Sequence, residues 1–374
     1  MAESVSWLKA MDPRETKLNI LLFALPITLY FNYVDQNHSM AFFSSLIAIM
    51  PLAFLMGRAT EEIALRTTES LGGLLNATFG NAAELIIAVL LILEASRVAD
   101  PETQSFFIQL VQASLIGSIL GNLLLVMGLA FVWGGIHHSE QKYSETQVSS
   151  NGSLLLLSMI VLVIPTVFQS SVGGEGGDSR LLDLSHIAAA ILLLVYGLFL
   201  LFQFRTHVHL FATDGSHHEE PEMTQRDSII LLVVATVLVS WMAEILVHSV
   251  EYAAEDFGLP HLFIGVILLP LFGNAAEHFT AVTVAGKDKM DLSFAISMGS
   301  STQIAVFIAP LMVIIAWALG VPLTFEFGIL ETVSAFLAVL IVNSIAADGK
   351  SNWLEGAMLL SSYGVLAAAF LFHP

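Results

Sequence analysis

Long apolar runs constrain this chain more than any other feature of its sequence. Eleven stretches are long and apolar enough to cross, as helices, a bilayer core of roughly 30 Å. They lie near residues 18–34, 40–57, 70–94, 106–134, 153–170, 184–205, 227–251, 260–285, 291–319, 325–345 and 352–372. A lipid-exposed strand would leave backbone groups unpaired, so these segments are predicted to be helical. We expect an all-α polytopic membrane protein with about 11 transmembrane helices.

Composition and charge exclude several other classes of protein. Charged residues make up 12% of the chain and hydrophobic residues 56%, whereas soluble domains are about a quarter charged. The formal charge of −19 argues against nucleic acid as a partner, because phosphate binding needs clustered cations. The absence of cysteine excludes disulfide frameworks and zinc–thiolate sites. Metal cations and protons are the natural ligands of such an acidic membrane chain.

The distribution of Lys and Arg predicts the orientation, because cytoplasmic loops carry an excess of both. With a cytoplasmic N-terminus, eleven of these residues fall inside, and only Arg97 and Arg180 fall outside. The inside residues are Lys9, Arg14, Lys17, Arg58, Arg66, Lys142, Arg205, Arg226, Lys287, Lys289 and Lys350. The C-terminus is then outside. We expect no cleavable signal peptide, because the first 17 residues are polar. With compact loops, this favours a prokaryotic plasma membrane. A homo-oligomer is compatible with the sequence.

An internal repeat divides the chain into two halves. The motif Gly80-Asn81-Ala82-Ala83-Glu84 recurs 193 residues later as Gly273-Asn274-Ala275-Ala276-Glu277. Each half holds five spans, an odd number, so the second half enters the membrane from the opposite side. We therefore predict one N-terminal helix plus two inverted five-helix repeats, the plan of many secondary transporters. The predicted parts are an N-terminal segment with the first helix (1–39), a first repeat (40–205), a linker (206–226) and a second repeat (227–374).

The linker, residues 206–226, is rich in His and acidic residues. It is predicted to be a hydrated connection between the halves. The alternative is a regulatory or metal-sensing segment.

The two motifs carry the candidate metal site. On one helix, Gly80 and Asn81 would share a face with Glu84, because residues three and four apart are neighbours. Two such faces meeting across a pseudo-two-fold axis supply carboxylate, amide and backbone oxygens, which suit a hard divalent cation such as Ca²⁺. A single buried Glu can also be a protonated structural residue, but intramembrane acids are costly and usually functional. The predicted metal-site residues are Glu84, Glu277, Gly80, Asn81, Gly273 and Asn274.

The helices that carry the motifs are expected to be interrupted. Glycines lie in or before the first motif, and Pro270 precedes the second. Proline removes a backbone hydrogen bond, and interrupted helices can turn carbonyl groups toward a ligand.

The charge of the empty site predicts exchange. Two carboxylates about 5 Å apart repel by roughly 3 kcal/mol at an effective dielectric constant near 20. Burial also disfavours the charged forms, so the empty pair is expected to bind protons. Ca²⁺ and protons then compete for the same oxygens. A carrier of this kind would change faces only when it is loaded with metal or protonated.

Other polar residues of the spans are candidates for the proton or ion pathway. They are Glu61, Glu62, Glu244, Asn76, Ser118, Ser300, Gln303 and His278. The alternatives remain open, because acids can be solvated at helix ends and hydroxyl groups often bond helix to helix. His248 is expected to have a packing role.

Taken together, these residues resemble the calcium/proton exchangers of the cation/proton exchanger (CAX) family, within the calcium/cation antiporter superfamily. The resemblance rests on Ala59-Thr60-Glu61-Glu62, the run 71–84, Gly273-Asn274-Ala275-Ala276-Glu277-His278 and the run 299–305. It implies an eleven-helix fold with Glu84 and Glu277 as metal ligands. It also implies backbone oxygens around Gly80 and Gly273 in the metal shell, and a pathway role for Glu61 and Glu244. The Pro-Glu repeat motifs of the distantly related sodium/calcium exchangers are absent.

The predicted function is secondary active antiport of Ca²⁺ and H⁺ by alternating access, with no enzymatic activity and no resident cofactor. The nearest alternatives are Na⁺/Ca²⁺ exchange and exchange of Mn²⁺ or another divalent cation for H⁺. A passive channel is a further alternative. An intramembrane metalloenzyme is disfavoured because no His-Glu-x-x-His helix is present.

Overall fold

A computed structural model describes residues 5–67, 72, 75, 78–172, 177–208 and 221–373. Within these residues the chain is mostly helical, with a single two-stranded sheet. Nine helices in this part are long and apolar enough to cross a membrane, and a bent pair of helices gives a tenth span. The expected span near 70–94 is described only in part. The predicted number of eleven is therefore neither confirmed nor contradicted.

The chain divides into two compact units. The first unit contains Met1–Leu90, Ala212–Leu259 and Leu271–Glu277; the second contains Leu91–Phe211, Pro260–Pro270 and His278–Pro374. Both units therefore draw on both halves of the sequence. The divisions after Leu90, Pro270 and Glu277 fall inside the two spans that carry the repeated motif.

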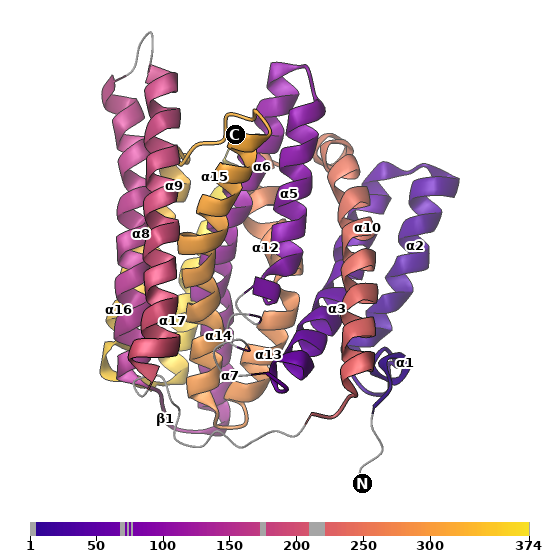
Figure 1. The fold of residues 1–374 in the computed structure, drawn as a ribbon, viewed down its shortest axis with the longest axis vertical. Helices are drawn as coiled ribbons and strands as arrows, with labels where there is room; N and C mark the ends of the chain where they lie inside the picture. The colour runs from indigo at the N-terminus through magenta and orange to yellow at the C-terminus, as the bar shows by residue number, and fades with distance from the viewer. Residues whose placement is uncertain are drawn as a thin grey trace. The chain divides into compact units, whose positions relative to one another are not determined.

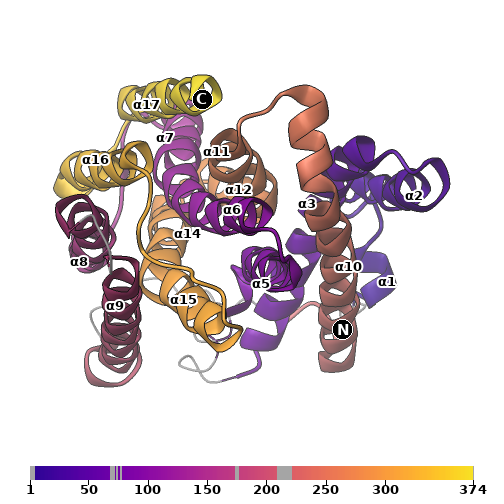
Figure 2. The same cartoon turned by 90° about the horizontal axis from the view of Figure 1, so that it is seen from above.

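The first unit is built on two long helices, α3 (His38–Ala64) and α10 (Gln225–Phe257), which pack along each other (Figures 1 and 2). The side chains of Asn37 and Thr224 cap their first turns. Small, fully buried residues of α3 such as Ala48 and Ala59 allow close packing of helices. The expected first span is a mixed helix, formed by η1 (Lys17–Phe23), α2 (Ala24–Tyr30) and η2 (Phe31–Asp35).

Three charged residues at the end of α3 hold the chain that leads into α10. Both carboxylate oxygens of Glu62 accept backbone N–H groups, from Glu222 and Met223, each at 3.1 Å. Arg58 forms an ion pair with the Glu222 carboxylate at 3.0 Å, and Arg66 donates to the carbonyl oxygen of Met223. Glu62 is 6% exposed. We call this group of contacts the α3 clasp. It fixes the end of the linker to the first unit.

The second unit contains two long composite spans that correspond in the repeat. One is α6 (Pro101–Leu120), η3 (Gly121–Val126) and α7 (Met127–His137); the other is α14 (Met290–Gln303), η7 (Ile304–Ile308) and α15 (Ala309–Ala318). In each, a π-helical segment, η3 or η7, interrupts the α-helix. Pro310 follows η7 closely and lacks the N–H that a regular helix would use.

Four further helices belong to the second unit. They are α8 (Glu145–Val172), α9 (Gly177–Leu201, continued by η4, Phe202–Thr206), α16 (Ile329–Ile345, followed by η8, Ala346–Asp348) and α17 (Trp353–Phe372). Helices α8 and α16 lie side by side (Figures 1 and 2). Helix α6 contacts the loop before α16. The side-chain amide of Gln112 on α6 donates to the carbonyl oxygens of Thr324 and Glu326 at 3.0 and 2.8 Å.

A short sheet closes one end of the second unit. Strand β1 (Gln141–Lys142) pairs antiparallel with β2 (Lys350–Ser351). Next to it, the ring of Tyr143 stacks on Phe294, with centroids 4.7 Å apart, and its hydroxyl donates to the carbonyl oxygen of Lys350 at 2.7 Å. The contacts fasten the loop between α7 and α8 to the loop between α16 and α17.

The two motif spans are broken, as the sequence predicts. After a turn at Gly80 and Asn81, α5 runs from Ala82 to Arg97. The second span consists of α11 (His261–Phe263), η6 (Ile264–Leu268), α12 (Leu269–Gly273) and α13 (Ala275–Ala285). Its two parts meet at an angle of 59°.

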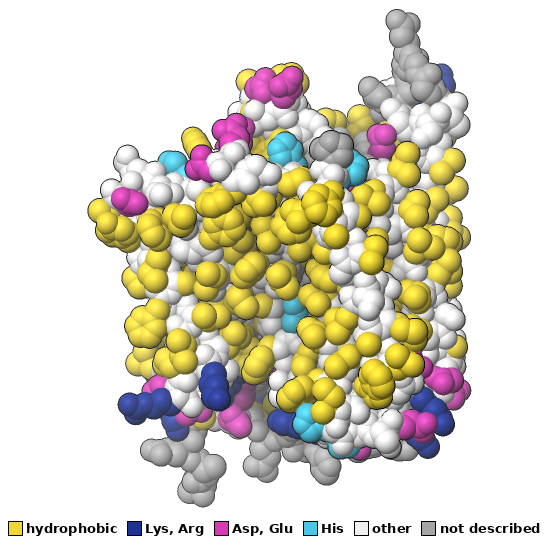
Figure 3. Space-filling model, turned by 180° about the vertical axis from the view of Figure 1, so that it is seen from behind, with side chains coloured by type: hydrophobic (Ala, Val, Ile, Leu, Met, Phe, Trp, Pro, Cys, Tyr) yellow, Lys and Arg dark blue, Asp and Glu magenta, His cyan; other side chains and the backbone are white. Residues whose placement is uncertain are grey.

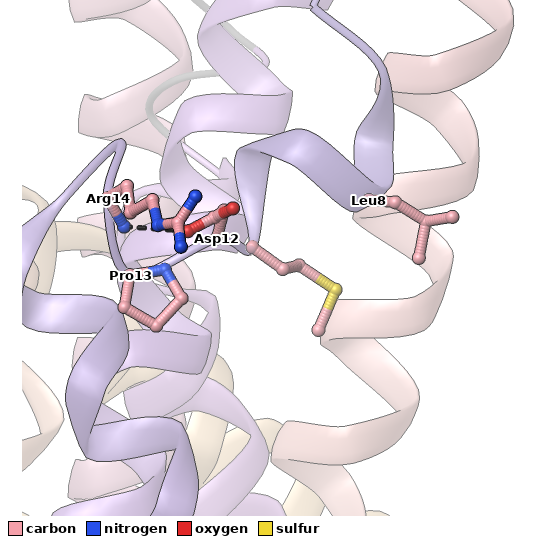
Figure 4. Close-up of a pocket in the computed structure, with 5 residues that line it drawn as sticks. Leu8, Asp12, Pro13 and Arg14 are labelled. Carbon is pink, nitrogen blue, oxygen red and sulfur yellow. Dashed lines mark hydrogen bonds between the residues drawn. The ribbon is translucent and has the colours of Figure 1, made fainter.

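The surface agrees with a membrane environment. On the face shown in Figure 3, hydrophobic side chains cover the sides of the helices, and most Lys, Arg, Asp and Glu side chains lie near the helix ends. A pocket of about 530 Å³ lies beside α1 (Trp7–Ala10) and is lined by Leu8, Met11, Asp12, Pro13 and Arg14 (Figure 4). Its single carboxylate, on Asp12, accepts the backbone N–H of Arg14 at 2.8 Å. The pocket thus offers no second acid to a divalent cation.

Candidate ion-binding site

The first motif places Glu84 at the beginning of a helix. The helical residues Thr78 and Phe79 precede the turn at Gly80 and Asn81, and Glu84 lies in the first turn of α5. The carbonyl oxygen of Asn81 accepts the N–H of Leu85 at 3.0 Å, the bond expected of an N-cap residue. Asn81 is 2% exposed. The break thus buries an amide directly before the helix that carries the acid.

The second motif repeats this arrangement. Helix α12 ends at Gly273, Asn274 lies in the break, and Glu277 is in the first turn of α13. Asn274 is 3% exposed, and its Nδ2 atom is buried without a hydrogen-bond partner in the described structure. The prediction that Gly80 and Asn81 share a helix face with Glu84 is wrong, because the chain turns at these two residues before α5 begins. Asparagine favours the N-cap, and glycine weakens a helix, so the chain breaks before each acid.

The fold brings the two motifs together within the first unit. A Cβ atom added at Gly273 would lie 3.8 Å from Cγ of Glu84, which is ordinary van der Waals contact. These residues are 189 positions apart in the chain. The first repeat's acid therefore lies against the backbone of the second repeat's motif.

This arrangement favours negative charge and oxygen ligands. The first turn of a helix has unpaired N–H groups and the positive end of the helix dipole, and each acid occupies such a turn. The motif side chains offer only carboxylate and amide groups. Among the described residues, no group of three or more His, Asp or Glu could hold a metal ion. Backbone or amide oxygens would therefore have to complete the shell of a Ca²⁺ ion, which prefers six to eight oxygens.

The polar residues of the long composite spans are buried in the second unit. Ser118 is 3% exposed and Ser300 is 5% exposed, and the amide of Asn122 donates to the hydroxyl of Ser300 at 2.9 Å. Gln303 is half-buried at the end of α14. The bond between Asn122 and Ser300 joins corresponding spans of the two repeats.

The remaining pathway candidates are in different environments. Glu61 on α3 and Glu244 on α10 are exposed, and His278 follows Glu277 in α13 and is half-buried. Asn76 lies outside the described residues. His248, for which packing was expected, is exposed on α10, one helical turn after Glu244.

Glu62 has a contact that sequence reasoning missed. Its carboxylate holds two backbone N–H groups in the α3 clasp, together with Arg58 and Arg66. Arg58 and Glu62 are four apart on α3, a spacing that places them on one face, and Arg66 follows shortly after the helix ends. The peptide they bind is 160 residues away in the sequence and carries no matching pattern.

Comparison with known proteins identifies the family. The model of the sodium/calcium exchanger protein family matches residues 38–205 and 227–372. The chain is 43% identical to a Ca²⁺/H⁺ antiporter of Aphanothece halophytica, covering 95% of this chain and 96% of that protein. It is 38% identical to a vacuolar calcium ion transporter of Schizosaccharomyces pombe, covering 100% of this chain and 90% of that protein.

Solved structures agree. The crystal structure of the Ca²⁺/H⁺ antiporter protein YfkE is 34% identical, with a TM-score of 0.78 over 96% of this chain and 99% of that one. The H⁺/Ca²⁺ exchanger CAX is 13% identical, with a TM-score of 0.67 over 96% of this chain and 93% of that one, which shows a common fold. The predicted fold class is confirmed. The chain belongs to the sodium/calcium exchanger protein family, and within it to the calcium/proton exchangers of the CAX branch.

Proposed function

We propose that this protein exchanges Ca²⁺ for H⁺ across a membrane as a secondary active antiporter. The observation that carries the proposal is the approach of Gly273 to Glu84, which brings the motifs of both repeats together inside one unit. The relatives that are named Ca²⁺/H⁺ antiporters and cation/proton exchangers support the choice of ions. Ca²⁺ and H⁺ are substrates here, and transport needs no resident cofactor and no chemical step.

Glu84 and Glu277 are the proposed metal ligands. The amides of Asn81 and Asn274, and backbone oxygens at the breaks near Gly80 and Gly273, would supply further oxygens. Two carboxylates suit a divalent cation because they neutralise it, and oxygen ligands favour Ca²⁺ over softer metals. The buried amide nitrogen of Asn274 lacks a partner in the described structure. A rotated amide would present its oxygen there.

The charge of the pair would couple the two ions. When the metal leaves, two carboxylates about 5 Å apart would repel by roughly 3 kcal/mol at an effective dielectric constant near 20, and proton binding relieves this repulsion. Metal and protons would then occupy the same oxygens at different times. An empty doubly charged site is costly to carry through the membrane, so the carrier would change faces only with one of its substrates bound.

Alternating access would follow from the two inverted repeats. In transporters of this plan, broken helices surround a site near the midplane, and one bundle moves against the other. The broken spans at Gly80 and at Gly273 and Asn274 are consistent with that plan. We further propose that Ser118, Ser300, Gln303 and His278 line the route of the ions, and that Glu61 and Glu244 carry protons toward the two surfaces.

The protein is an integral membrane protein, and we propose a cytoplasmic N-terminus and a C-terminus outside. The excess of Lys and Arg on one side supports this orientation. The relatives include a Ca²⁺/H⁺ antiporter of Synechocystis and a vacuolar calcium ion transporter, so the choice of a prokaryotic plasma membrane rests on the sequence alone.

Transport into proteoliposomes tests the function. A proton gradient, acid inside, should drive uptake of ⁴⁵Ca²⁺, and replacing Glu84 or Glu277 by Gln should abolish it. Glu102→Gln is the matched control, because Glu102 is an exposed acid in the first turn of α6. Uptake driven by Na⁺ instead of H⁺, or Mn²⁺ transported in preference to Ca²⁺, would favour the nearest alternatives. Flux without any counter-gradient would favour a channel.

A further inference from the structure

Two glycines let the first half of the second motif span pack unusually close to α6. A Cβ atom at Gly265 would lie inside van der Waals contact with Cβ of Ala113. A Cβ atom at Gly117 would overlap the carbonyl oxygen of Val266 and lie 2.6 Å from its Cα and 2.7 Å from Cγ of Pro270. These five residues belong to the second unit. The contact therefore has no room for a methyl group on either helix.

The carbonyl group of Val266 has a particular reason to face Gly117. Pro270 has no N–H, so the carbonyl group of Val266 cannot accept the α-helical bond from four residues later, and it lies in η6, a π-helical segment. The hydrogen that replaces a side chain on Gly117 points at this oxygen, and Cα–H groups act as weak donors to carbonyl groups between closely packed helices. Any side chain at this position would remove that contact and push the backbone of η6 away from α6.

The segment 264–270, which packs against α6, leads directly to the proposed metal site. Pro270 is three residues before Gly273, where the helix breaks and approaches Glu84. The chain from Val266 to Gly273 is continuous helix, η6 followed by α12. A displacement of η6 would thus be carried along α12 to the residue that contacts Glu84. A misplacement of about 1 Å can change the function of a site by two orders of magnitude.

We propose that Gly117 and Gly265 are positioning residues. By allowing residues 264–270 to pack closely against α6, they set the Ca²⁺ affinity of the paired-glutamate site. This proposal rests on the proposed function, because it takes Glu84 and Glu277 as the ligands. It also predicts that the two glycines differ in whether a second substitution can relieve the steric conflict caused by an added methyl group. Gly265 meets a side chain, so the conflict can be relieved by a second substitution. Gly117 meets backbone, so its conflict cannot be relieved in this way.

Exchanging the residues at positions 113 and 265, so that the methyl group moves from one helix to the other, tests the proposal on the purified protein. Gly265→Ala should weaken Ca²⁺ binding at least about tenfold, whereas the double variant Ala113→Gly/Gly265→Ala should restore most of the affinity. The added methyl group then lies 3.5 Å from Cα of Ala113, which is ordinary contact. Gly117→Ala should weaken binding at least as much. Gly197→Ala is the control, because no atom of the described structure lies within 4 Å of its added Cβ.

Two readouts separate positioning from folding. Calorimetric titration with Ca²⁺ gives Kd, and ⁴⁵Ca²⁺ uptake into proteoliposomes gives KM and maximal rate at equal protein content. The proposal expects Kd and KM to rise in Gly265→Ala and to recover in the swap. An unchanged Kd in Gly265→Ala, or a swap that binds no better than the single variant, would overturn it. Wild-type protein without proton-driven uptake would instead contradict the proposed function, and the Kd comparison would still decide the role of the glycines.

Discussion

Asn122 donates a hydrogen bond from its side-chain amide to the hydroxyl of Ser300 at 2.9 Å, and both residues are buried. The bond connects η3 of the first repeat to α14 of the second. Hydrogen bonds between membrane helices contribute about 0.6 kcal/mol on average. This one also fixes a hydroxyl group that we place on the ion route.

Removal of the hydrogen bond between Asn122 and Ser300 should lower the stability of the folded protein modestly. Asn122→Ala and Ser300→Ala should each lower the free energy of unfolding by about 1 kcal/mol. The double variant should lose less than the sum, because both substitutions remove the same bond. Thermal unfolding in detergent measures this coupling. Fully additive losses would show that the two side chains do not interact.

Glu62 should be structural. Replacing Glu62 by Gln leaves one acceptor oxygen for two backbone N–H groups, so unfolding should become easier by about 1–3 kcal/mol. The pH dependence of transport should stay unchanged. Glu61→Gln is the comparison, because Glu61 is its exposed neighbour on α3. If Glu62→Gln shifts the pH profile without loss of stability, Glu62 belongs to the proton pathway after all.

Gly273 should tolerate one methyl group and no more. An added Cβ would only touch Cγ of Glu84, at 3.8 Å, so Gly273→Ala should change the KM for Ca²⁺ by less than about threefold, within roughly 0.65 kcal/mol. Gly273→Leu must displace the Glu84 side chain and should abolish uptake. Measurement of ⁴⁵Ca²⁺ uptake against Ca²⁺ concentration tests both variants. If both variants lost Ca²⁺ uptake equally, the glycine would be needed for its backbone conformation instead.

Tyr143 should make the second unit sensitive to alkali. Burial raises the pKa of Tyr143, and the nearby carboxylates of Glu355 and Asp348 raise it further. The pKa is thus higher in the folded state than the usual value near 10. The stability that this group contributes is complete below about pH 10 and is lost as the pH rises through the folded-state pKa.

Tyr143→Phe isolates this effect. The variant lacks the hydrogen bond to the carbonyl oxygen of Lys350 and should lose about 0.5–1.5 kcal/mol at neutral pH. Its stability should fall less steeply than that of the wild type above about pH 10. Melting curves from pH 7 to pH 11 measure both quantities. If the stability of the wild type and of Tyr143→Phe fell equally with pH, ionisation of Tyr143 would not cause the loss.

The sequence was sufficient for the elements whose signal is local. Apolar length predicts α3, α10 and the other spans because lipid allows few alternatives to a helix. The repeated motif and Pro270 predict the broken spans, since five identical residues and a missing N–H are readable without a structure. The choice of Glu84 and Glu277 as ligands follows from the same repeat and still awaits its test.

What the sequence could not predict depends on partners far away in the chain. The α3 clasp depends on a backbone segment near Met223, and backbone groups carry no sequence signature. The close contact of Gly117 with Val266 requires knowledge of which helix lies opposite. Asn81 and Asn274 were placed on a helix because spacing alone does not distinguish an interior position from a cap.

The proposed exchange depends most on competition between Ca²⁺ and protons for the oxygens of Glu84 and Glu277. Proton release on metal binding tests it directly, with purified protein in lightly buffered detergent solution and a pH indicator. Addition of Ca²⁺ should acidify the solution in proportion to the protein, and Glu84→Gln and Glu277→Gln should release fewer protons or none. Saturating Ca²⁺ binding without any release of protons would contradict the account.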